Sequence, residues 1–369
     1  MKRIKELDGI RGIAILLVLT YHYFFNGAVI DSQLVNQFLK LLHLGWSGVD
    51  LFFVLSGFLI VGVLLDSKNS SNFFSVFYIR RALRILPLYY VLLASFLILP
   101  RFISNEDLFK HTLPFWSYLS FTQNLFMLKL DFGSSWLAVT WSLAVEEQFY
   151  LLLPLLVWKL DKKKLVYVFV SLIAIAPIIR VLFNGLGGYI FTFARSDVLL
   201  TGGLLAIAYR DQKTKDFLVR NINLLVVLFF IFLFGAGTLI LQGFTHIGDP
   251  FVHSWMGGLY SLFLTICILS PSKITNIFVS NPFFIWLGVR SYSIYLFHLP
   301  ITILTHQFVT GHKNPYYSNW NEFFVTLLSM GITIVFAELS MKVFESFFLS
   351  YGKSFQYKFD KTLPPISKE

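Results

Sequence analysis

The chain has 369 residues, of which 56% are hydrophobic and only 14% are charged, whereas roughly a quarter of the residues are charged in an average globular protein. So little polar surface cannot cover a water-soluble fold of this length, which indicates an integral membrane protein. The single cysteine, Cys267, excludes an internal disulfide and a cysteine-based metal site. The net charge is +10, but the placement of the basic residues indicates a membrane topology rather than a nucleic-acid-binding surface, so no nucleic-acid partner is expected.

The apolar runs predict helices rather than the strands of a membrane barrel. They are unbroken stretches of about twenty residues, the length that a helix needs to cross a bilayer. The predicted fold class is therefore all-α, a polytopic membrane helix bundle of about ten transmembrane helices. The predicted spans are 10–29, 46–65, 83–100, 136–158, 165–183, 192–209, 222–242, 253–271, 283–309 and 322–349.

The basic residues predict how these spans are oriented. Of the 30 Lys and Arg residues, 20 fall on one side of the predicted bundle, five fall on the other, and the remaining five lie within spans or at their edges. Because cytoplasmic loops carry an excess of Lys and Arg, both termini are predicted to be cytoplasmic. Residues 1–350 are predicted to form one integral membrane domain, followed by a short basic cytoplasmic tail at 351–369.

The first predicted span places an arginine and a histidine on one face. Arg11 and His22 are eleven residues apart, so on an α-helix they differ by about 20° and lie about 16 Å apart along the axis. Burial disfavours the charged form of a histidine, so His22 is expected to be neutral and able to accept a proton. The alternative is a core histidine that bonds a neighbouring helix, with Arg11 as a topology anchor.

The second and third spans carry further charges. Asp50 is a lone carboxylate that enters the second span from the exterior, either for catalysis or as a buried partner for an arginine such as Arg195. Arg80, Arg81 and Arg84 share one face at the cytoplasmic end of the third span. Guanidinium groups in that arrangement suit phosphate oxygens, although membrane anchoring would explain one or two of them.

The fourth span contains two adjacent glutamates, which are the residues most costly to place in a membrane. Ser142 lies one turn before Glu146 on the same face, whereas Glu147 points about 100° away. The two carboxylates are therefore expected to have different partners. Structure alone rarely requires both, so we interpret the pair as functional.

Polar residues also enter the sixth and ninth spans. Arg195 and Asp197 begin the sixth span from the exterior side. Ser291, Tyr295 and His298 share a face of the ninth, and His298 is a second mid-membrane histidine that competes with His22 for a proton-transfer role.

Several motifs of soluble catalysis are missing from the sequence. It contains no H-E-x-x-H, no G-x-S-x-G, no G-x-x-x-x-G-K-[ST] and no His-x4-Asp signature, and its eight histidines are scattered, so no metal is expected. Glu338 and Glu345 in the last span are interpreted as structural partners for buried arginines.

Taken in order, these segments resemble the acyltransferase-3 family of bacterial integral membrane acyltransferases. The similarity is specific because the matching segments are collinear over nearly the whole chain. They are Asp8–Gly12 with the Arg11-x10-His22 spacing, Gly48–Ile60, Arg81–Tyr89, Trp141–Tyr150, Arg195–Asp197 and Leu287–His298. One departure is that Glu345 is followed by Ser346, whereas the family often has a proline shortly after a glutamate near the end of the last span.

The resemblance implies a membrane O-acyltransferase in the bacterial cytoplasmic (inner) membrane. It would move an acyl group, usually acetyl, from cytoplasmic acyl-CoA to a hydroxyl on an extracytoplasmic glycan or related acceptor. It implies that His22 is the central catalytic residue and that Glu146 helps to arrange the acceptor. It also implies that Arg11, Arg81 and Arg84 serve the donor, and in the hypothesis from the residues the phosphates of acyl-CoA lie on Arg80, Arg81 and Arg84.

The residues and the resemblance lead to one hypothesis with two open routes. His22 either removes the proton of the acceptor hydroxyl or carries the acyl group itself. Glu146, with Glu147 or Asp50, would orient the histidine or bind the acceptor. The remaining acceptor-binding or structural polar residues are Ser142, Arg195, Asp197, Tyr295 and His298, and the aromatic residues that could stack on sugar rings are Trp116, Trp136 and Trp141.

Two rival functions remain at this point. Buried charges at the midplane of a bundle also suit a transporter or flippase of lipid-linked sugars, although no inverted repeat is visible in the sequence. A non-enzymatic assembly subunit is the third reading, and the density of charge within the spans disfavours it.

Overall fold

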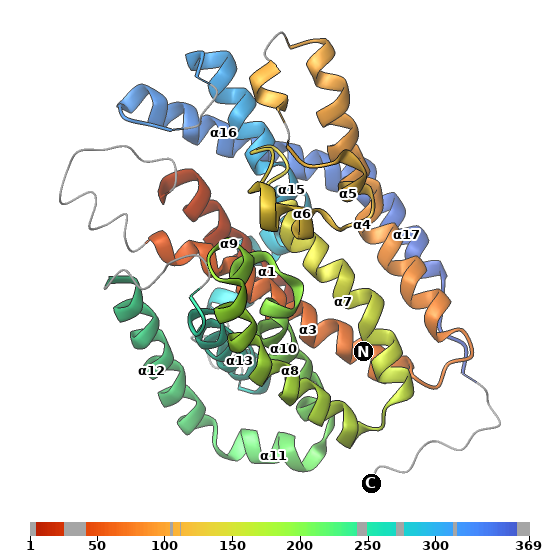
Figure 1. The fold of residues 1–369 in the computed structure, drawn as a ribbon. Helices are drawn as coiled ribbons and strands as arrows, with labels where there is room; N and C mark the ends of the chain where they lie inside the picture. The colour runs from red at the N-terminus through yellow and green to blue at the C-terminus, as the bar shows by residue number, and fades with distance from the viewer. Residues whose placement is uncertain are drawn as a thin grey trace.

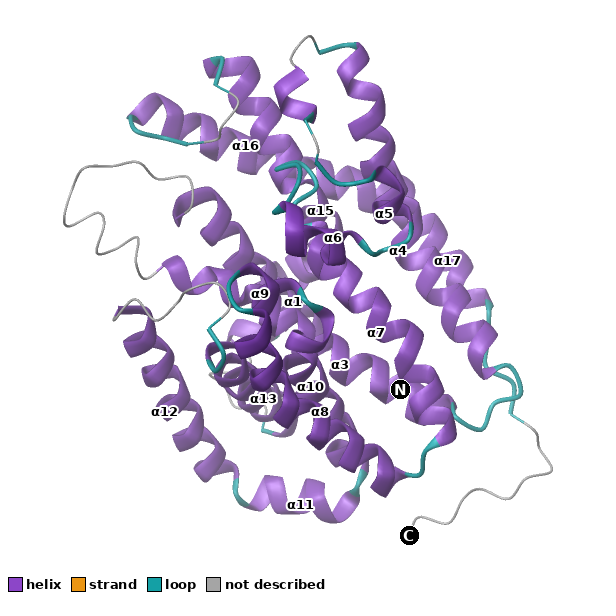
Figure 2. Cartoon of the chain, in the orientation of Figure 1, coloured by secondary structure: helices purple, strands orange, loops and turns teal. Residues whose placement is uncertain are grey.

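The structure is a computed structural model of the chain, and it describes residues 5–25, 42–103, 106–110, 112–241, 249–270, 277–312 and 316–359. The described residues form a bundle of helices joined by short loops (Figures 1 and 2). Strand pairing within them is limited to one isolated bridge between Ser70 and Phe359. The predicted all-α fold class is confirmed.

The long helices match the ten predicted spans. They are α1 (Lys5–Leu19), α3 (Gly48–Ser67), α4 (Phe73–Ile98), α7 (Thr140–Lys159), α8 (Lys162–Phe183), α10 (Ser196–Arg210), α12 (Ile222–Leu241), α13 (Val252–Leu269), α15 (Pro282–Thr310) and α16 (Trp320–Leu339), which continues through a π-helical turn at Ser340–Glu345 into α17 (Ser346–Ser354). Short helices lie between them: α5 (Phe115–Leu119), α6 (Gln123–Leu130), α9 (Leu186–Ile190) and α11 (Gln212–Arg220).

Seven helical stretches in the described part of the chain are long and apolar enough to cross a membrane. The other three predicted spans, α7, α10 and α15, are also helical, but α7 carries adjacent glutamates and α10 has only 15 residues. Burial differs strongly among the seven. In the most apolar part of α3, 72% of the residues are buried, against 6% in α12, so α3 is central and α12 faces outward. The chain is a multi-pass membrane protein.

The observed helix ends differ from the predicted span boundaries in informative places. The third span begins at Phe73, ten residues before the predicted start, and so includes Arg80 and Arg81 within its helix. The boundary predicted between membrane domain and tail at residue 350 falls inside α17. Residues 26–29, 242 and 271, which were included in predicted spans, lie outside the described residues.

The basic ends of the helices meet at one end of the bundle. Arg210 at the end of α10 pairs with Asp66 near the end of α3 at 2.7 Å, and Lys162 at the start of α8 pairs with Asp211 at 2.7 Å. Lys68 Nζ donates to the carbonyl of Leu160 at 2.6 Å. The amphipathic helix α11 runs along this end, at the lower edge of Figure 1. This end is the one that the distribution of Lys and Arg predicts to be cytoplasmic.

Two close helix crossings position the site. A Cβ atom on Gly288 of α15 would lie 1.7 Å from the carbonyl oxygen of Asp8 in α1, and one on Gly57 of α3 would lie 1.8 Å from that of Leu199 in α10. Only glycine allows backbones to approach this closely. The first crossing brings the helix of His22 against α15, and the second brings α3 against α10.

Helix starts follow ordinary capping rules. The side chain of Asn281 accepts a hydrogen bond from the backbone N–H of Phe283 at 2.9 Å, and Pro282 occupies the first helical position of α15. The ninth predicted span, 283–309, begins one residue after this start. At the other end, Gly311 adopts φ = +76°, a left-handed conformation that ends the helix.

Candidate active site

Three cavities follow one another from the basic end of the bundle toward the opposite end. We call them the basic pocket, the middle cavity and the outer cavity, with volumes of about 230, 110 and 620 Å³ respectively. Arg81 and Arg84 line both the basic pocket and the middle cavity. Val49 and Tyr295 line both the middle and the outer cavity. Because each cavity shares a wall with the next, the three form a series across the bundle.

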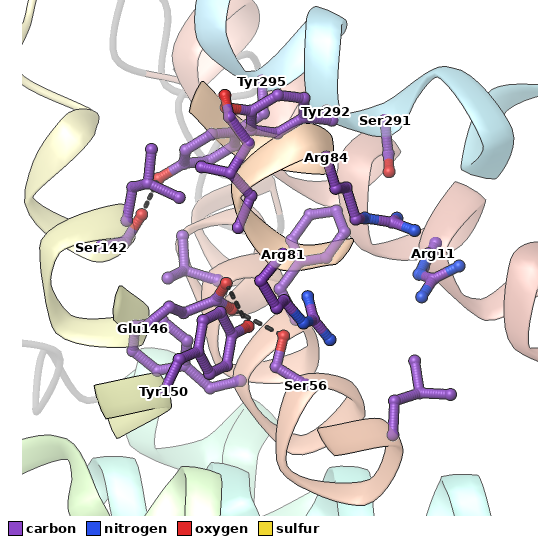
Figure 3. Close-up of a pocket in the computed structure, with 16 residues that line it drawn as sticks. Arg11, Ser56, Arg81, Arg84, Ser142, Glu146, Tyr150, Ser291, Tyr292 and Tyr295 are labelled. Atoms are coloured by element: carbon purple, nitrogen blue, oxygen red, sulfur yellow. Dashed lines mark hydrogen bonds between the residues drawn. The ribbon is translucent and has the colours of Figure 1, made fainter. Parts of the chain in front are cut away.

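The middle cavity is built around arginines (Figure 3). The side chains of Arg11, Arg81 and Arg84 point toward the same side of the cavity. Arg81 also lies over the ring of Tyr150, 4.7 Å from its centroid. Arg11 is paired with Asp8 at 2.8 Å, whereas no carboxylate among the described residues lies within ion-pair distance of Arg81 or Arg84. The cavity therefore presents two cations without a carboxylate partner, an arrangement suited to an anion.

Glu146 lies on this arginine-lined side, not beside His22. Its carboxylate accepts hydrogen bonds from Ser56 Oγ at 2.7 Å and from the Tyr150 hydroxyl at 2.8 Å. Glu146 lines the middle cavity and not the outer one, so it lies apart from the cavity that His22 lines. Glu147 points elsewhere, as predicted. It lines none of the three cavities, and its Oε1 is buried with no hydrogen-bond partner among the described residues.

Tyr295 and Ser142 form the boundary between the middle and outer cavities. Ser142 Oγ and the Tyr295 hydroxyl are 2.6 Å apart, and the Tyr295 hydroxyl lies 3.0 Å from the carbonyl oxygen of Val139. This contact joins α7 to α15 across the path. A substrate that reached from the middle cavity into the outer one would pass this pair.

His22 lies in a π-helical turn, Thr20–Phe25, that follows α1. Turns of this kind are frequent at functional sites because the widened backbone redirects side chains. The ring lines the outer cavity, and its Nδ1 lies 3.0 Å from the carbonyl oxygen of Val18. Nδ1 of His22 also lies 3.3 Å from Nε2 of His298, a residue that is fully buried. The two histidines that compete in the sequence are thus in contact.

The hydrogen-bond partners define which ring nitrogens carry protons in the neutral histidines. Nδ1 of His298 is 2.8 Å from the carbonyl oxygen of Tyr295, and a carbonyl can only accept. Nδ1 of His298 therefore holds the proton and Nε2 accepts. Nδ1 of His22 faces that Nε2 and a second carbonyl, so it donates, which leaves the lone pair on Nε2 of His22. This Nε2 has no partner among the described residues and is not a buried atom.

The opposite wall of the outer cavity contains a buried charge cluster. Asp50 and Arg195 are both fully buried and form an ion pair. Asp50 Oδ2 also lies 3.4 Å from Nδ1 of His253, whose ring lines the outer cavity. The arginine is enclosed by aromatic rings, those of Phe53, Trp141 and Tyr189. Of the two readings of Asp50, a buried partner for Arg195 is the arrangement that the structure shows.

Comparison with known proteins identifies this arrangement. The model of the acyltransferase-3 family, described as an acyltransferase domain, matches residues 4–339. The chain belongs to the acyltransferase-3 family. The match covers all the helices from α1 to α16, including every residue named above for the middle and outer cavities.

Named relatives within the family are bacterial proteins. One from Staphylococcus aureus, named "Putative O-acetyltransferase", is 29% identical over 95% of this chain. The "Putative peptidoglycan O-acetyltransferase YrhL" of Bacillus subtilis is 30% identical over 93% of it, and the "Peptidoglycan O-acetyltransferase OatA" of Listeria monocytogenes is 30% identical over 97%. The chain spans 54–58% of the length of these relatives. No solved structure matches it.

Other predicted residues have structural contacts in this family member. Asp197 pairs with Arg180 at 2.7 Å and accepts from Ser254 at 2.5 Å, and both charged groups are buried. Glu338 pairs with Arg290, as predicted, whereas Glu345 accepts from the hydroxyl of Ser340 rather than from an arginine.

Of the three tryptophans proposed for sugar stacking, only Trp141 lines the outer cavity. Trp116 is exposed on the surface, and Trp136 is 1% exposed and packed against Phe96 and Phe109. The surrounding fold, which a run of sequence does not reveal, decides which of these rings can reach a ligand.

Sequence reasoning missed three residues of the cavities. His253 lies at the very start of a predicted span, where a histidine costs little free energy of membrane insertion and therefore gives no sign of a function. Lys353 and Tyr357 line the basic pocket but belong to the segment predicted to be a tail. For Lys353 a signal existed, because the basic residues near the C-terminus lie on the same predicted side as Arg80 and Arg81.

Proposed function

We propose that the chain transfers an acetyl group from acetyl-CoA on the basic, cytoplasmic side of the membrane to a hydroxyl group of an acceptor in the outer cavity. The observation that carries this proposal is the position of His22. Its Nε2 lone pair faces the outer cavity, whose wall at Tyr295 is also the wall of the arginine-lined middle cavity. The family and the names of its O-acetyltransferase relatives support the same reaction.

The donor enters from the basic end. Arg81 and Arg84 bind its phosphate oxygens, because their guanidinium groups are bidentate donors and no carboxylate in the described chain pairs with them. The pantetheine arm then extends through the middle cavity past Ser142 and Tyr295. Arg11 lines the middle cavity and His22 lines the outer one, so the two residues mark the two ends of this extended arm.

His22 supplies the base. Its Nε2 takes the proton of the acceptor hydroxyl while the oxygen forms a bond to the thioester carbon. The carbon–sulfur bond then breaks, and the CoA thiolate leaves and takes the proton from the imidazolium. In the second route, Nε2 itself attacks the thioester carbon and the CoA thiolate leaves; the acceptor oxygen then takes the acetyl group from Nε2, and the hydroxyl proton passes to the thiolate. Labelling of the wild-type protein in the absence of acceptor, released by hydroxylamine or by acid as an acyl-imidazole would be, distinguishes the two routes.

His298 is a positioning residue in this scheme. Its Nε2 accepts from Nδ1 of His22, and its own Nδ1 is fixed by the Tyr295 carbonyl. A partner on Nδ1 selects the tautomer whose Nε2 is free and holds the ring in place. Glu146, bonded to Ser56 and Tyr150 beside Arg81, acts on the donor side by ordering that wall of the middle cavity.

The acceptor occupies the outer cavity. This cavity is large, polar on several sides and bordered by the aromatic rings of Trp46, Trp141 and Tyr189, which suits a sugar ring with its apolar faces and hydroxyl edges. We propose a cell-envelope glycan as the acceptor. Peptidoglycan is the first candidate to assay, since two of the relatives carry it in their names, and the bacterial cytoplasmic membrane is the proposed location.

The test is transfer of labelled acetyl groups by the purified protein in lipid nanodiscs. His22→Ala should reduce transfer by about 10²–10⁴-fold, the range for loss of a general base. The matched control is His312→Ala, because the side chain of His312 is 64% exposed and faces none of the cavities. Wild-type turnover in His22→Ala would disprove this role of His22, and wild-type protein that transfers no acetyl group from acetyl-CoA would disprove the function.

A further inference from the structure

The basic pocket is formed by two parts of the chain that are far apart in the sequence. Its polar wall consists of Arg80, Arg81 and Arg84 from α4 and of Lys353 and Tyr357 from the C-terminal segment 346–359. Among the described residues that line the pocket there is no aspartate or glutamate. The remaining wall is apolar, with Phe77 and Phe348 among its residues. Lys353 and Tyr357 lie beyond residue 339, where the match to the family model ends.

The C-terminal segment is anchored by its backbone. The carbonyl of Phe355 accepts from Arg80 Nε at 2.7 Å, and that of Gln356 accepts from Asn72 Nδ2 at 2.9 Å. The backbone N–H and C=O of Lys358 bond Asn72 and Ser71, each at 2.9 Å. α17 lies beside α4 in both views of the fold (Figures 1 and 2). The side chains of Lys353 and Tyr357 are not needed for this attachment.

Tyr357 carries an unused hydroxyl in the pocket. Its ring lies under the guanidinium group of Arg80, 5.3 Å from the carbon to the centroid. Its hydroxyl is buried and has no hydrogen-bond partner among the described residues. Buried polar groups normally have partners because losing a hydrogen bond to water is costly. A hydroxyl without a partner, on a tyrosine that lines the same pocket as three arginines and a lysine, can donate to an anionic ligand.

We propose that the basic pocket binds the phosphate-bearing nucleotide end of the acyl-CoA donor, and that Lys353 and Tyr357 are binding residues for it. This inference rests on the proposed function. Four cationic groups and a free hydroxyl match phosphate oxygens, and the apolar wall with Phe77 and Phe348 matches the flat face of a base. Since Arg81 and Arg84 also line the middle cavity, the pantetheine arm continues directly from this pocket toward Tyr295.

The experiment compares two donors. Acetyl-CoA has the nucleotide, and S-acetylpantetheine lacks it while keeping the same thioester. With acetyl-CoA, Lys353→Ala and Tyr357→Phe should each raise the KM by about three- to tenfold, the range for one hydrogen bond at a partly exposed phosphate site. With S-acetylpantetheine, the KM of each variant should equal that of the wild type. Direct binding of CoA, measured by calorimetry in nanodiscs of neutral lipid, should weaken by the same factor.

The controls are Lys358→Ala and Tyr351→Phe. Lys358→Ala removes one positive charge from the same segment, as Lys353→Ala does, but Lys358 does not line the pocket. Tyr351 is an exposed tyrosine of α17. Both should bind CoA like the wild type. Equal CoA affinity in Lys353→Ala, Tyr357→Phe and the wild type would overturn the inference while leaving the acetyl transfer intact.

A second arm tests whether the pocket holds a lipid headgroup instead. The calorimetry is repeated in nanodiscs that contain an anionic phospholipid. Competition between lipid and CoA in the wild type, reduced in Lys353→Ala, supports a phosphate pocket that CoA occupies. Weakened lipid binding in Lys353→Ala with unchanged CoA binding would assign the pocket to lipid and overturn the inference. Absence of acetyl transfer from either donor would refute the proposed function alone.

Discussion

Ionisable groups lie at both the outer cavity and the middle cavity, but the two cavities balance charge differently. Beside the outer cavity, the carboxylate of Asp50 faces the guanidinium group of Arg195 and a ring nitrogen of His253. In the middle cavity, Arg81 and Arg84 have no carboxylate partner among the described residues, and Glu146 is bonded to hydroxyl groups instead. The first region pairs its arginine with a carboxylate, and the second has two cations without such a partner among the described residues.

This difference separates structural charges from binding charges. A cation that no carboxylate of the described residues pairs with is available to bind an anionic ligand. The paired charges near the outer cavity hold helices together. In the proposed function, the unpaired arginines mark the route of the anionic donor. Substitutions on the two sides should therefore affect different measurements.

Breaking the outer ion pair should have the largest effect on stability. Asp50→Asn keeps the size of the side chain but leaves the buried charge of Arg195 without a counterion, which should cost about 3–5 kcal/mol of unfolding free energy. Thermal unfolding of the purified protein in detergent measures the loss. Asp66→Asn is the control, because the Asp66–Arg210 pair is partly exposed, and it should cost at most about 1 kcal/mol. Equal losses in the two variants would contradict the distinction between the regions.

Removing the unpaired arginines should change binding instead. The double variant Arg81→Gln and Arg84→Gln should raise the KM for acetyl-CoA by about 30–100-fold, because two charge-assisted contacts to phosphate are lost. Its melting temperature should stay near that of the wild type, since neither arginine has a carboxylate partner among the described residues to lose. Steady-state kinetics at varied acetyl-CoA and a melting curve test both statements. A lower melting temperature with an unchanged KM would make these arginines structural.

The sequence predicted much of the fold because the signals for membrane spans are local. Twenty-residue apolar runs, glycines at close crossings and a proline after Asn281 are all visible in short windows. The same logic placed Arg11 and His22 on one face of one helix, and it named Arg195 as a partner for Asp50. The π-helical turn at His22 carries no comparable signal, because it depends on how α1 packs against its neighbours.

The parts that could not be predicted depend on contacts between distant helices. Periodicity shows that Glu146 and Glu147 point in different directions, but it does not show that Glu146 faces arginines while His22 faces the outer cavity. Trp136 and Trp141 are five residues apart and equally aromatic, yet one is packed in the core and the other lines the cavity. The role of Tyr357 depends on a segment folding back onto α4.

His298 offers a sharper test of the outer cavity. His298→Leu removes the group that accepts a hydrogen bond from Nδ1–H of His22, so His22 loses its fixed tautomer. The kcat should then fall about tenfold, the lower end of the range for loss of a residue that orients a functional histidine. His298→Gln, whose side-chain oxygen can accept the same hydrogen bond, should recover part of the rate. KM for acetyl-CoA should stay unchanged in both. A shift in that KM, or identical rates in the two variants, would show that His298 only fills space.

The smallest expected effect concerns His253, another imidazole that lines the outer cavity. In His253→Asn the amide N–H can still donate to Asp50, so the buried ion pair keeps its partner, while the free ring nitrogen is lost. If that nitrogen binds an acceptor hydroxyl, the KM for a soluble oligosaccharide acceptor should rise about three- to tenfold, the effect of one hydrogen bond. The KM for acetyl-CoA and the melting temperature should not change. A loss of kcat as large as that in His22→Ala would instead make the two imidazoles equal partners in catalysis, whereas a loss of melting temperature alone would assign His253 to the structural charges around Arg195.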